Sequence, residues 1–425
     1  MEIGQLYTIY QEHSSVQTDT RNLNNGDLFF ALKGSNFNGN EFAKQAIDAG
    51  ASYAIIDQDE FEIQGKTILV KNVLDTLQEL AKYHRQQFKI PFLAITGSNG
   101  KTTTKDLIHA VLSTQYKTYT TEGNLNNHIG VPLTILKIKD DAEMAVIEMG
   151  ANHIGEIASY CKIALPHHGL ITNCGKAHLE GFGSEEGVRK GKGELFDHLR
   201  EHNGMAFLMK DYDYLQEMSK GISQLFTYGT KDADVEGRVL QNEPFLEISI
   251  HTGANLPSIK TQLVGEYNFP NVVAAVAVGK YFKVQDEKIK KAIENYVPSN
   301  SRSQLIKKGS TTIILDAYNA NPSSMMLAIE NFAKMNASNK VLLLGAMAEL
   351  GYQSLKEHQS ILNLILQYKW KNVVLVGGDF MKINHPFLKF ENAEQAKQWF
   401  HQQDFSNCSL LIKGSRSIQM EKVLE

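Results

Sequence analysis

The residue types best suited to hold phosphate occur in one short run, Thr96-Gly97-Ser98-Asn99-Gly100-Lys101-Thr102-Thr103-Thr104. Glycines let backbone N–H groups approach phosphate oxygens closely, and the free N–H groups that open a helix favour anions. A lysine in this position can neutralise charge on the β- and γ-phosphates, and the hydroxyl after it can ligate Mg²⁺. The run is therefore predicted to bind nucleotide phosphates through Gly97, Ser98, Asn99, Gly100, Lys101, Thr102 and Thr103.

The surroundings of the run match those of a phosphate loop. An apolar strand is expected at 92–96 and a helix from Lys101. The general pattern G-x-x-x-x-G-K-[ST] is incomplete, because Ile95 stands at its first glycine position, and this departure argues against a generic GTPase or transport ATPase. A plain Gly-Asn turn followed by a chance Gly-Lys-Thr is the alternative, which the flanking strand and helix disfavour.

Alternating strands and helices must position this loop, and they predict an α/β fold of three domains. Residues 1–89 form the first. Residues 90–298 form a central phosphate-loop domain built on a parallel sheet, with a small antiparallel patch in the β-type runs SQLFTY, LEISIHT and TQLVG of 223–264. A linker is expected at 297–301, and residues 299–425 are expected to form a Rossmann-like third domain. Because this domain lacks G-x-G-x-x-G after a strand, no dinucleotide is assigned to it.

Composition narrows the class of protein further. The 425 residues carry a formal net charge of −4, which argues against a nucleic-acid binder. No apolar run is long enough to span a membrane, and Met1-Glu2-Ile3-Gly4 does not open a signal peptide. Three widely spaced cysteines indicate neither a disulfide framework nor a zinc site. We expect a cytoplasmic protein.

Beyond the loop, several motifs resemble those of the Mur ligases. They include Glu122–Asn127 (EGNLNN), Ile147–Ala151 (IEMGA), Asn173–Glu180 (NCGKAHLE) and Gly265–Asn271 (GEYNFPN). The run Asp316–Met325 (DAYNANPSSM) resembles the branch of that family that adds D-alanyl-D-alanine to a UDP-linked muramoyl tripeptide. The resemblance spans essentially the whole chain. It implies ATP-dependent activation of a carboxylate as an acyl phosphate, followed by attack of an amine.

This resemblance also implies metal ligands and catalytic residues. Two Mg²⁺ ions are expected, with Thr102, Glu148, His178 and a carbamylated Lys192 as ligands, and Lys101, Glu148, His178 and Lys192 as the catalytic set. An unmodified lysine cannot ligate a metal, whereas a carbamate supplies oxygen. Alternatives remain for each residue. Glu148 could be an ordinary solvent-facing carboxylate, and His178 could be structural. The modified lysine could be Lys190, or the segment could be only a basic, solvated helix face.

Substrate contacts follow from the same resemblance. Asn268, Asn271, Arg302 and Asp316 are expected to reach ATP, with helix capping as the alternative for the two asparagines. Asp19, Thr20 and Arg21 are expected to hold the UDP-sugar of the first domain, and Asn319 and Asn321, with Met347 and Glu349, the D-alanyl-D-alanine pocket. Asn40 stands where the family usually has His, which leaves that position without an assigned role.

The partners expected are thus two small molecules, the UDP-muramoyl tripeptide and D-alanyl-D-alanine, bound by a monomer. Closure of the third domain onto the second is expected with ATP. Three alternatives remain: a sister Mur ligase or folylpolyglutamate-type ligase, a non-enzymatic nucleotide-binding module, and a helicase-like NTPase. The run Asn319–Pro322 disfavours the first, the set Glu148, His178 and Lys192 the second, and the acidic net charge the third.

Overall fold

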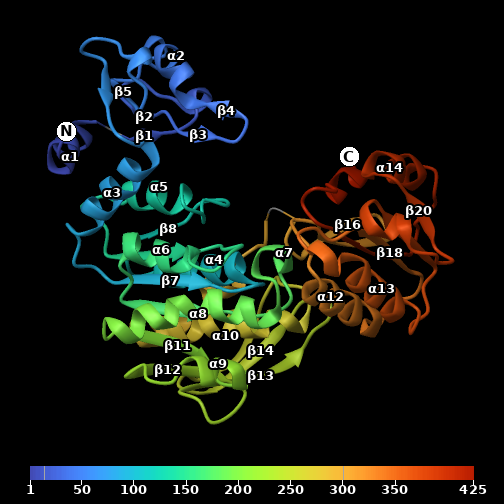
Figure 1. Cartoon of the computed structure of the whole chain (residues 1–425). Helices are drawn as coiled ribbons and strands as arrows, with labels where there is room; N and C mark the ends of the chain where they lie inside the picture. Colours follow the sequence, from blue (N-terminus) through green and yellow to red (C-terminus); the bar gives the residue numbers. More distant parts are fainter. Residues whose placement is uncertain (14, 300) are drawn as a thin grey trace. The chain divides into compact units, whose positions relative to one another are not determined.

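A computed structural model describes residues 1–13, 15–299 and 301–425 of the chain (Figure 1). The chain packs as two compact units, and both are mixed α/β as the sequence predicts. The first unit comprises Met1–Ile95, Tyr116–Gly150 and Glu156–Gly169, and the second Thr96–Gln115, Ala151–Gly155 and Leu170–Glu425. The expected linker includes Asn300, which lies outside the described residues. The domain boundaries expected at 89/90 and 298/299 stay predictions.

The first unit opens with a small parallel sheet. Its strands β1 (Val16–Gln17), β2 (Leu28–Phe30), β5 (Tyr53–Ile56) and β6 (Thr67–Leu69) pair in the order β1-β2-β5-β6. All three residues of β2 are buried, as expected for a central strand covered on both faces. Helix α1 (Ile3–Glu12) precedes β1. A short hairpin of β3 (Lys33–Gly34) and β4 (Phe37–Asn38), followed by α2 (Ala43–Asp48), lies between β2 and β5 in the chain.

Helix α3 (Val73–Arg85) follows this sheet. It begins where the Asn72 side chain accepts a hydrogen bond from the Asp75 N–H, a standard N-cap. It buries Val73, Leu77, Leu80 and Ala81, the spacing of one helical face.

The remainder of the first unit contains a second set of parallel strands. Here β7 (Phe92–Thr96) pairs with β9 (Met144–Glu148), which pairs with β8 (Thr118–Thr120). The helices α5 (Gly130–Leu136) and α6 (Glu156–Ala164) also belong to this unit. The register places Ile95, the residue before the phosphate loop, opposite Glu148. The strand β10 (His168–Ile171) runs from the first unit into the second.

The second unit carries the phosphate loop on α4 (Lys101–Leu112). Further along the chain lie α7 (Leu179–Phe182), α8 (Glu185–Glu201), α9 (Asp213–Met218), α10 (Phe269–Tyr281) and α11 (Asp286–Asn295). Ten residues of α10 are buried, so this nearly all-apolar helix lies within the core.

The expected antiparallel patch differs in detail from the observed one. Strand β12 (Gln224–Gly229) is parallel to both β11 (Met205–Met209) and β13 (Val235–Gln241). Only β13, β14 (Glu247–Thr252) and β15 (Leu256–Lys260) run antiparallel. The run TQLVG of 261–265 is not a strand, and the prediction there was wrong. Its contact with Leu246 is local: the Thr261 N–H and hydroxyl both donate to the Leu246 carbonyl, and the Leu246 N–H donates to the Leu263 carbonyl.

The chain ends in a six-stranded sheet of order β16-β17-β21-β18-β19-β20, drawn in orange to red in Figure 1. All neighbours are parallel except the pair of β16 (Gln304–Lys308) and β17 (Thr311–Asp316). The other strands are β18 (Lys340–Gly345), β19 (Asn372–Val376), β20 (Leu388–Phe390) and β21 (Ser409–Lys413). The helices are α12 (Pro322–Lys334), α13 (Ser354–Ile365) and α14 (Ala393–His401). Apolar strand residues form the core of this sheet.

No helix among the described residues is long and apolar enough to cross a membrane. The three cysteines are free and buried, so each packs as a small apolar residue.

Candidate active site

The phosphate loop has a backbone that only glycine adopts easily. Gly97 has φ +143° and Gly100 has φ +79°. A Cβ atom on Gly97 would lie 2.0 Å from Thr172 Oγ1, and one on Gly100 would lie 2.6 Å from Asn271 Oδ1. Both glycines are therefore required for the backbone conformation and for the close packing of their neighbours.

The end of β10 holds the loop in place. The Asn99 N–H donates to Asn173 Oδ1 at 3.1 Å, and the Asn99 carbonyl accepts from Thr172 Oγ1 at 2.6 Å. The Ser98 hydroxyl donates to the Gly175 carbonyl at 2.9 Å. Sequence reasoning assigned Thr172 and Asn173 no role, although their position just after a buried strand was the available signal.

Lys101 and Thr102 open helix α4, as the loop pattern predicts. Lys101 Nζ donates to the Gly97 carbonyl at 2.7 Å and lies 3.3 Å from the Ser98 carbonyl. Thr102 is buried, whereas Thr103 is partly exposed. The amine thus lies over the loop that it is predicted to serve, within reach of an anion bound there.

Lys192 is fully buried on α8, while Lys190 on the same helix is exposed. Lys192 Nζ donates to the Ala151 carbonyl at 2.8 Å and lies 5.0 Å from the centroid of the Phe182 ring. Burial raises the pKa of the neighbouring Cys174 thiol to about 12, which disfavours its thiolate form. Of these two lysines, only Lys192 is enclosed by protein, and the expected carbamate on it stays a prediction.

Glu148 lies at the end of β9 in the first unit and is 1% exposed. Its Oε1 accepts from Asn126 Nδ2 at 2.7 Å, and its backbone N–H donates to Thr121 Oγ1 at 2.9 Å. An ordinary solvent-facing carboxylate is therefore ruled out at this position. Asn126, from the run EGNLNN, orients the carboxylate, a role that the sequence did not identify.

His178 pairs with the C-terminal region of the second unit. Its Nδ1 lies 2.6 Å from Glu349 Oε2, and both residues have positive φ, +51° and +61°. The Glu180 N–H also donates to the Glu349 carbonyl at 3.0 Å. Hydrogen bonding to His178, with a smaller contribution from Lys101, holds the pKa of the Glu349 carboxyl below its usual range against the opposing effect of burial.

Among the residues that the structure describes, no three His, Cys, Asp or Glu side chains gather into a metal site. The donors expected for Mg²⁺ are instead a hydroxyl (Thr102), a buried carboxylate (Glu148), an imidazole (His178) and a buried lysine (Lys192). The hydroxyl and the carboxylate are oxygen donors of the kind that Mg²⁺ takes, whereas Lys192 could ligate it only as a carbamate. The metal assignment stays a prediction.

Asn268 and Asn271, expected at adenine, are both buried and bonded to one another. Asn271 Nδ2 donates to Asn268 Oδ1 at 2.9 Å, and Asn268 Nδ2 donates to the Val264 carbonyl at 2.9 Å. Thr104 Oγ1 donates to Asn271 Oδ1 at 3.0 Å. Asn268 occupies the N-cap of α10 but its side chain makes no capping hydrogen bond, so capping does not explain it. This network connects α10 to the helix that follows the phosphate loop.

Arg302 lies flat on an aromatic ring. Its guanidinium carbon is 3.5 Å from the centroid of Tyr318, a cation–π contact. Within the described part of the chain its buried Nε has no hydrogen-bond partner. A guanidinium with an unused donor is suited to an anion, and Tyr318, which the sequence did not single out, fixes its orientation.

Asp316 ends β17 and is bound by groups of the protein itself. Lys413 Nζ, which is almost fully buried, lies 2.6 Å from Asp316 Oδ2 and 3.2 Å from the Asn319 carbonyl. The Ser303 N–H donates to Asp316 Oδ1 at 3.2 Å. Lys413 therefore supports the turn that carries the expected acceptor residues.

That turn brings together residues far apart in the chain. Asn319 is exposed, and its Oδ1 accepts from the Ala320 N–H at 2.9 Å. Asn321 Nδ2 donates to Asn99 Oδ1 of the phosphate loop at 2.7 Å. Met347, also expected at the acceptor pocket, lies outside this turn; it is buried, and its N–H donates to His358 Nε2 at 3.0 Å. The run that selects the family branch thus contacts the phosphate loop directly.

In the first unit, Asp19 and Arg21 form a local pair. Arg21 Nη2 lies 2.6 Å from Asp19 Oδ2, and the Asp19 side chain accepts from the Arg21 N–H at 3.0 Å. Hydrogen bonds from Arg21 lower the pKa of the Asp19 carboxyl to about 2. Asp19 caps the short 3₁₀ turn Thr20–Asn22, and Arg21 within that turn is exposed.

Asn40, the position without an assigned role, is fully buried. Its Nδ2 donates to Asn38 Oδ1 and to Asp57 Oδ1, both at 2.9 Å, and its Oδ1 accepts from the Asp57 N–H at 2.9 Å. Asn40 therefore holds the turn of the first unit together.

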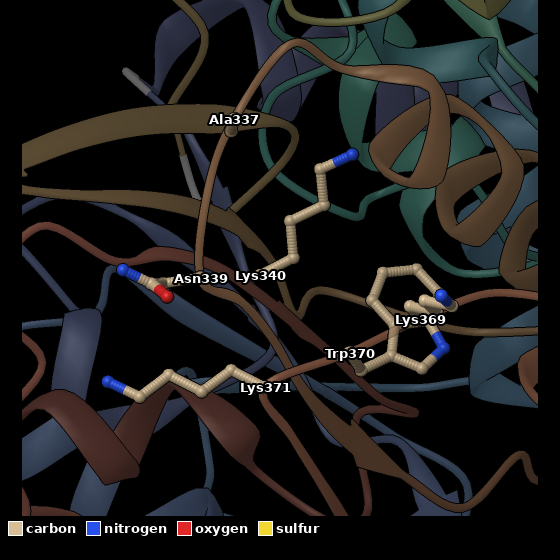
Figure 2. A pocket seen from close by; sticks show the side chains of 6 residues that line it. All are labelled: Ala337, Asn339, Lys340, Lys369, Trp370 and Lys371. Atoms are coloured by element: carbon tan, nitrogen blue, oxygen red, sulfur yellow. The ribbon is translucent and has the colours of Figure 1, made fainter.

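A separate hollow of about 350 Å³ lies elsewhere on the second unit (Figure 2). It is lined by Ala337, Asn339, Lys340, Lys369, Trp370 and Lys371. These residues precede or begin β18 and β19, at the amino ends of the parallel strands, whereas α/β sheets bind ligands at the carboxyl ends. Lys340 Nζ already donates to the Ala333 carbonyl at 2.5 Å. The hollow is distinct from the site described above.

A glycine loop between a parallel strand and a helix, joined to an asparagine-rich turn of a second α/β sheet, defines a phosphate-binding α/β protein. Three family models match it: "Mur ligase family, catalytic domain" over residues 12–88, "Mur ligase middle domain" over 95–279 and "Mur ligase, glutamate ligase domain" over 301–412. The chain belongs to the Mur ligase family.

Individual relatives and structures agree with this assignment. The UDP-N-acetylmuramoyl-tripeptide--D-alanyl-D-alanine ligase of Bacillus subtilis is 35% identical, over 96% of this chain and 92% of that protein. The crystal structure of MurF from Acinetobacter baumannii matches with a TM-score of 0.88 at 30% identity, covering 99% and 97% of the two chains. MurF ligase from Thermotoga maritima, in complex with ADP, matches with a TM-score of 0.86 at 26% identity, covering 98% and 97%.

Proposed function

We propose that this chain joins D-alanyl-D-alanine to a UDP-N-acetylmuramoyl tripeptide at the expense of ATP, giving the UDP-muramoyl pentapeptide used in peptidoglycan. Relatives with that name match it nearly end to end. The observation that supports this most directly is the contact of Asn321, from the branch-specific run, with Asn99 of the phosphate loop. The acceptor segment and the phosphoryl donor would then meet at one point.

The first step is transfer of the γ-phosphoryl group to the tripeptide carboxylate. A carboxylate oxygen bonds to Pγ, the bond from Pγ to the β,γ-bridging oxygen breaks, and ADP leaves. Lys101 balances charge on the transferring group, and the loop N–H groups orient it. Arg302, held on Tyr318, supplies a second cation. Positioning and charge stabilisation provide most of the catalysis.

In the second step the D-alanyl-D-alanine amine attacks the acyl carbon. A tetrahedral intermediate forms, phosphate leaves with one oxygen from the carboxylate, and the amine loses a proton. Asn319 is exposed on the turn before α12 and is our candidate for contact with the dipeptide, together with Asn321. Water must be excluded between the two steps, because it would hydrolyse the acyl phosphate.

Two Mg²⁺ ions are proposed to hold and neutralise the phosphate oxygens. Thr102 and Glu148 would hold one ion, and His178 with a carbamylated Lys192 the other. Burial of Lys192 supports this, because a carbamate there is sheltered from water. Asn268, Asn271 and Asp316 are proposed to line the nucleotide, and Asp19, Thr20 and Arg21 the UDP-sugar. We propose that the protein is cytoplasmic, because ATP and UDP-linked substrates occur in that compartment. We also propose that it acts as a monomer.

The function is tested by phosphate release with ATP, Mg²⁺, UDP-muramoyl tripeptide and D-alanyl-D-alanine, leaving out one component at a time. We expect release that needs all four, with the pentapeptide detected by mass spectrometry. Release with another amine in place of the dipeptide would assign the chain to a sister branch. ATP binding without turnover would indicate a non-enzymatic module and contradict the proposal.

A further inference from the structure

Asn321 uses the two ends of its side-chain amide for different partners. Its Oδ1 accepts from the Ser324 N–H at 2.9 Å and caps helix α12. Its Nδ2 donates to Asn99 Oδ1 at 2.7 Å. A backbone N–H can only donate, so the cap fixes which end of the amide is oxygen and turns the nitrogen toward Asn99. At 8% exposure, Asn321 is itself buried in this contact.

The start of α12 makes a second contact with the phosphate-loop region. The Lys176 N–H donates to Ser323 Oγ at 2.8 Å. A Cβ atom on Gly175 would lie 2.7 Å from Ser323 Oγ, so this approach needs a glycine. The Gly175 carbonyl in turn accepts from the Ser98 hydroxyl at 2.9 Å. One turn, 173–176, therefore supports both the phosphate loop and α12.

Asn99 is held from two directions. Its backbone is bound by Asn173 and Thr172 at the end of β10. Its side chain is bound by Asn321 at the start of α12. A residue fixed in this way transmits the position of α12 to the loop, because buried, close-packed groups do not move independently.

We propose that Asn321 is a positioning residue, which acts through Asn99 to hold the phosphate loop in its catalytic shape. Phosphoryl transfer to the tripeptide then depends on the turn before α12, which is also proposed to receive the amine. The γ-phosphoryl group of ATP is therefore transferred only when this turn is in place. This role rests on the proposed ligase function. It predicts that Asn321 matters for the first step, which takes place before the dipeptide reacts.

Two substitutions separate positioning from helix capping. Asp and Ser cap helices about as well as Asn. Asn321→Asp keeps the cap but replaces the donor with a carboxylate oxygen facing Asn99 Oδ1. Asn321→Ser also keeps the cap, cannot reach Asn99, and adds no charge near the phosphates. Asn392→Asp is the matched control, because Asn392 caps α14 through the Gln395 N–H at 3.0 Å and lies at an exposed position.

The readout is positional isotope exchange in ATP, measured with Mg²⁺ and UDP-muramoyl tripeptide but without D-alanyl-D-alanine. It reports reversible formation of the acyl phosphate. We expect Asn321→Asp and Asn321→Ser to exchange about tenfold more slowly, as expected for the loss of one partly buried hydrogen bond. Asn392→Asp should match the wild type. In an Asn99→Ala background, Asn321→Ser should cause no further loss.

Two results would overturn the inference. One is wild-type exchange by Asn321→Ser with only a raised KM for D-alanyl-D-alanine in the full reaction, because Asn321 would then act on the acceptor alone and not on the phosphate loop. The other is an equal loss from Asn321→Ser with and without Asn99, because the effect would then not pass through the loop. Absence of exchange in the wild-type protein would instead refute the ligase function itself, and the inference with it.

Discussion

Replacing Gly97 by alanine tests whether the phosphate loop is the catalytic centre. The new Cβ atom would lie 2.0 Å from Thr172 Oγ1, 3.1 Å from the Asn173 nitrogen and 3.1 Å from its carbonyl oxygen. The two Asn173 contacts are with backbone, which cannot rotate away. The Thr172 hydroxyl would have to move, and with it the 2.6 Å hydrogen bond to the Asn99 carbonyl would be lost.

Two contributions set the size of the effect. A non-glycine residue at φ +143° costs about 1–3 kcal/mol of backbone strain. Loss of the Thr172 hydrogen bond adds about 1 kcal/mol. If the loop relieves this strain by moving, the whole cost appears in the phosphoryl-transfer step. About 2–4 kcal/mol corresponds to a fall of roughly 30- to 1,000-fold in kcat/KM for ATP.

Gly309→Ala is the matched control. Gly309 also has positive φ, +60°, but a Cβ atom there meets nothing within 4 Å. It should lower stability slightly and leave turnover unchanged. Both variants would be assayed by phosphate release at varied ATP, after circular dichroism establishes that they are folded. If Gly97→Ala keeps activity within about threefold of wild type, the loop is not where the phosphoryl group is held and the reasoning fails.

Three further predictions concern single side chains. Lys192→Ala should abolish turnover and recover part of it with added acetate, whereas Lys190→Ala should retain activity; a buried lysine serving only to pack would show no acetate rescue. Tyr318→Leu should raise the KM for ATP by about tenfold through loss of the stacked guanidinium, with the melting temperature changing little. Burial lowers the pKa of His358, which accepts from Met347 as a neutral ring. Its contribution to stability is therefore full above the usual histidine pKa and falls as the pH drops below that value, because the unfolded chain then takes up a proton that the folded chain resists. The urea midpoint should fall more between about pH 7.5 and 5.5 for wild type than for His358→Leu, and equal falls would contradict this.

Much of the site was predictable because its signals are local. Gly97, Gly100 and Lys101 stand within one turn of chain between a strand and a helix, and that context determines both their geometry and their partners. The choice of Lys192 over Lys190 stays a prediction. The structure adds that Lys192 lies on the buried face of α8 and Lys190 on the exposed face.

Contacts between distant segments were not predictable in the same way. Asn99 and Asn321 are 222 positions apart, and no periodicity relates them. No local pattern predicts the pairing of His178 with Glu349 either, nor the stacking of Arg302 on Tyr318. The run TQLVG has β-type residues but is not a strand, because its backbone contacts with Leu246 are local and do not extend β15. Tertiary context outweighs local propensity in such cases.

The proposed chemistry is tested most directly by following one oxygen atom. UDP-muramoyl tripeptide labelled with ¹⁸O in its reacting carboxylate would be incubated with ATP, Mg²⁺ and D-alanyl-D-alanine, and both products analysed by mass spectrometry. Acyl-phosphate chemistry predicts one labelled oxygen in each phosphate released, with one pentapeptide formed per phosphate. Unlabelled phosphate, or phosphate released without pentapeptide, would contradict the proposed ligase reaction.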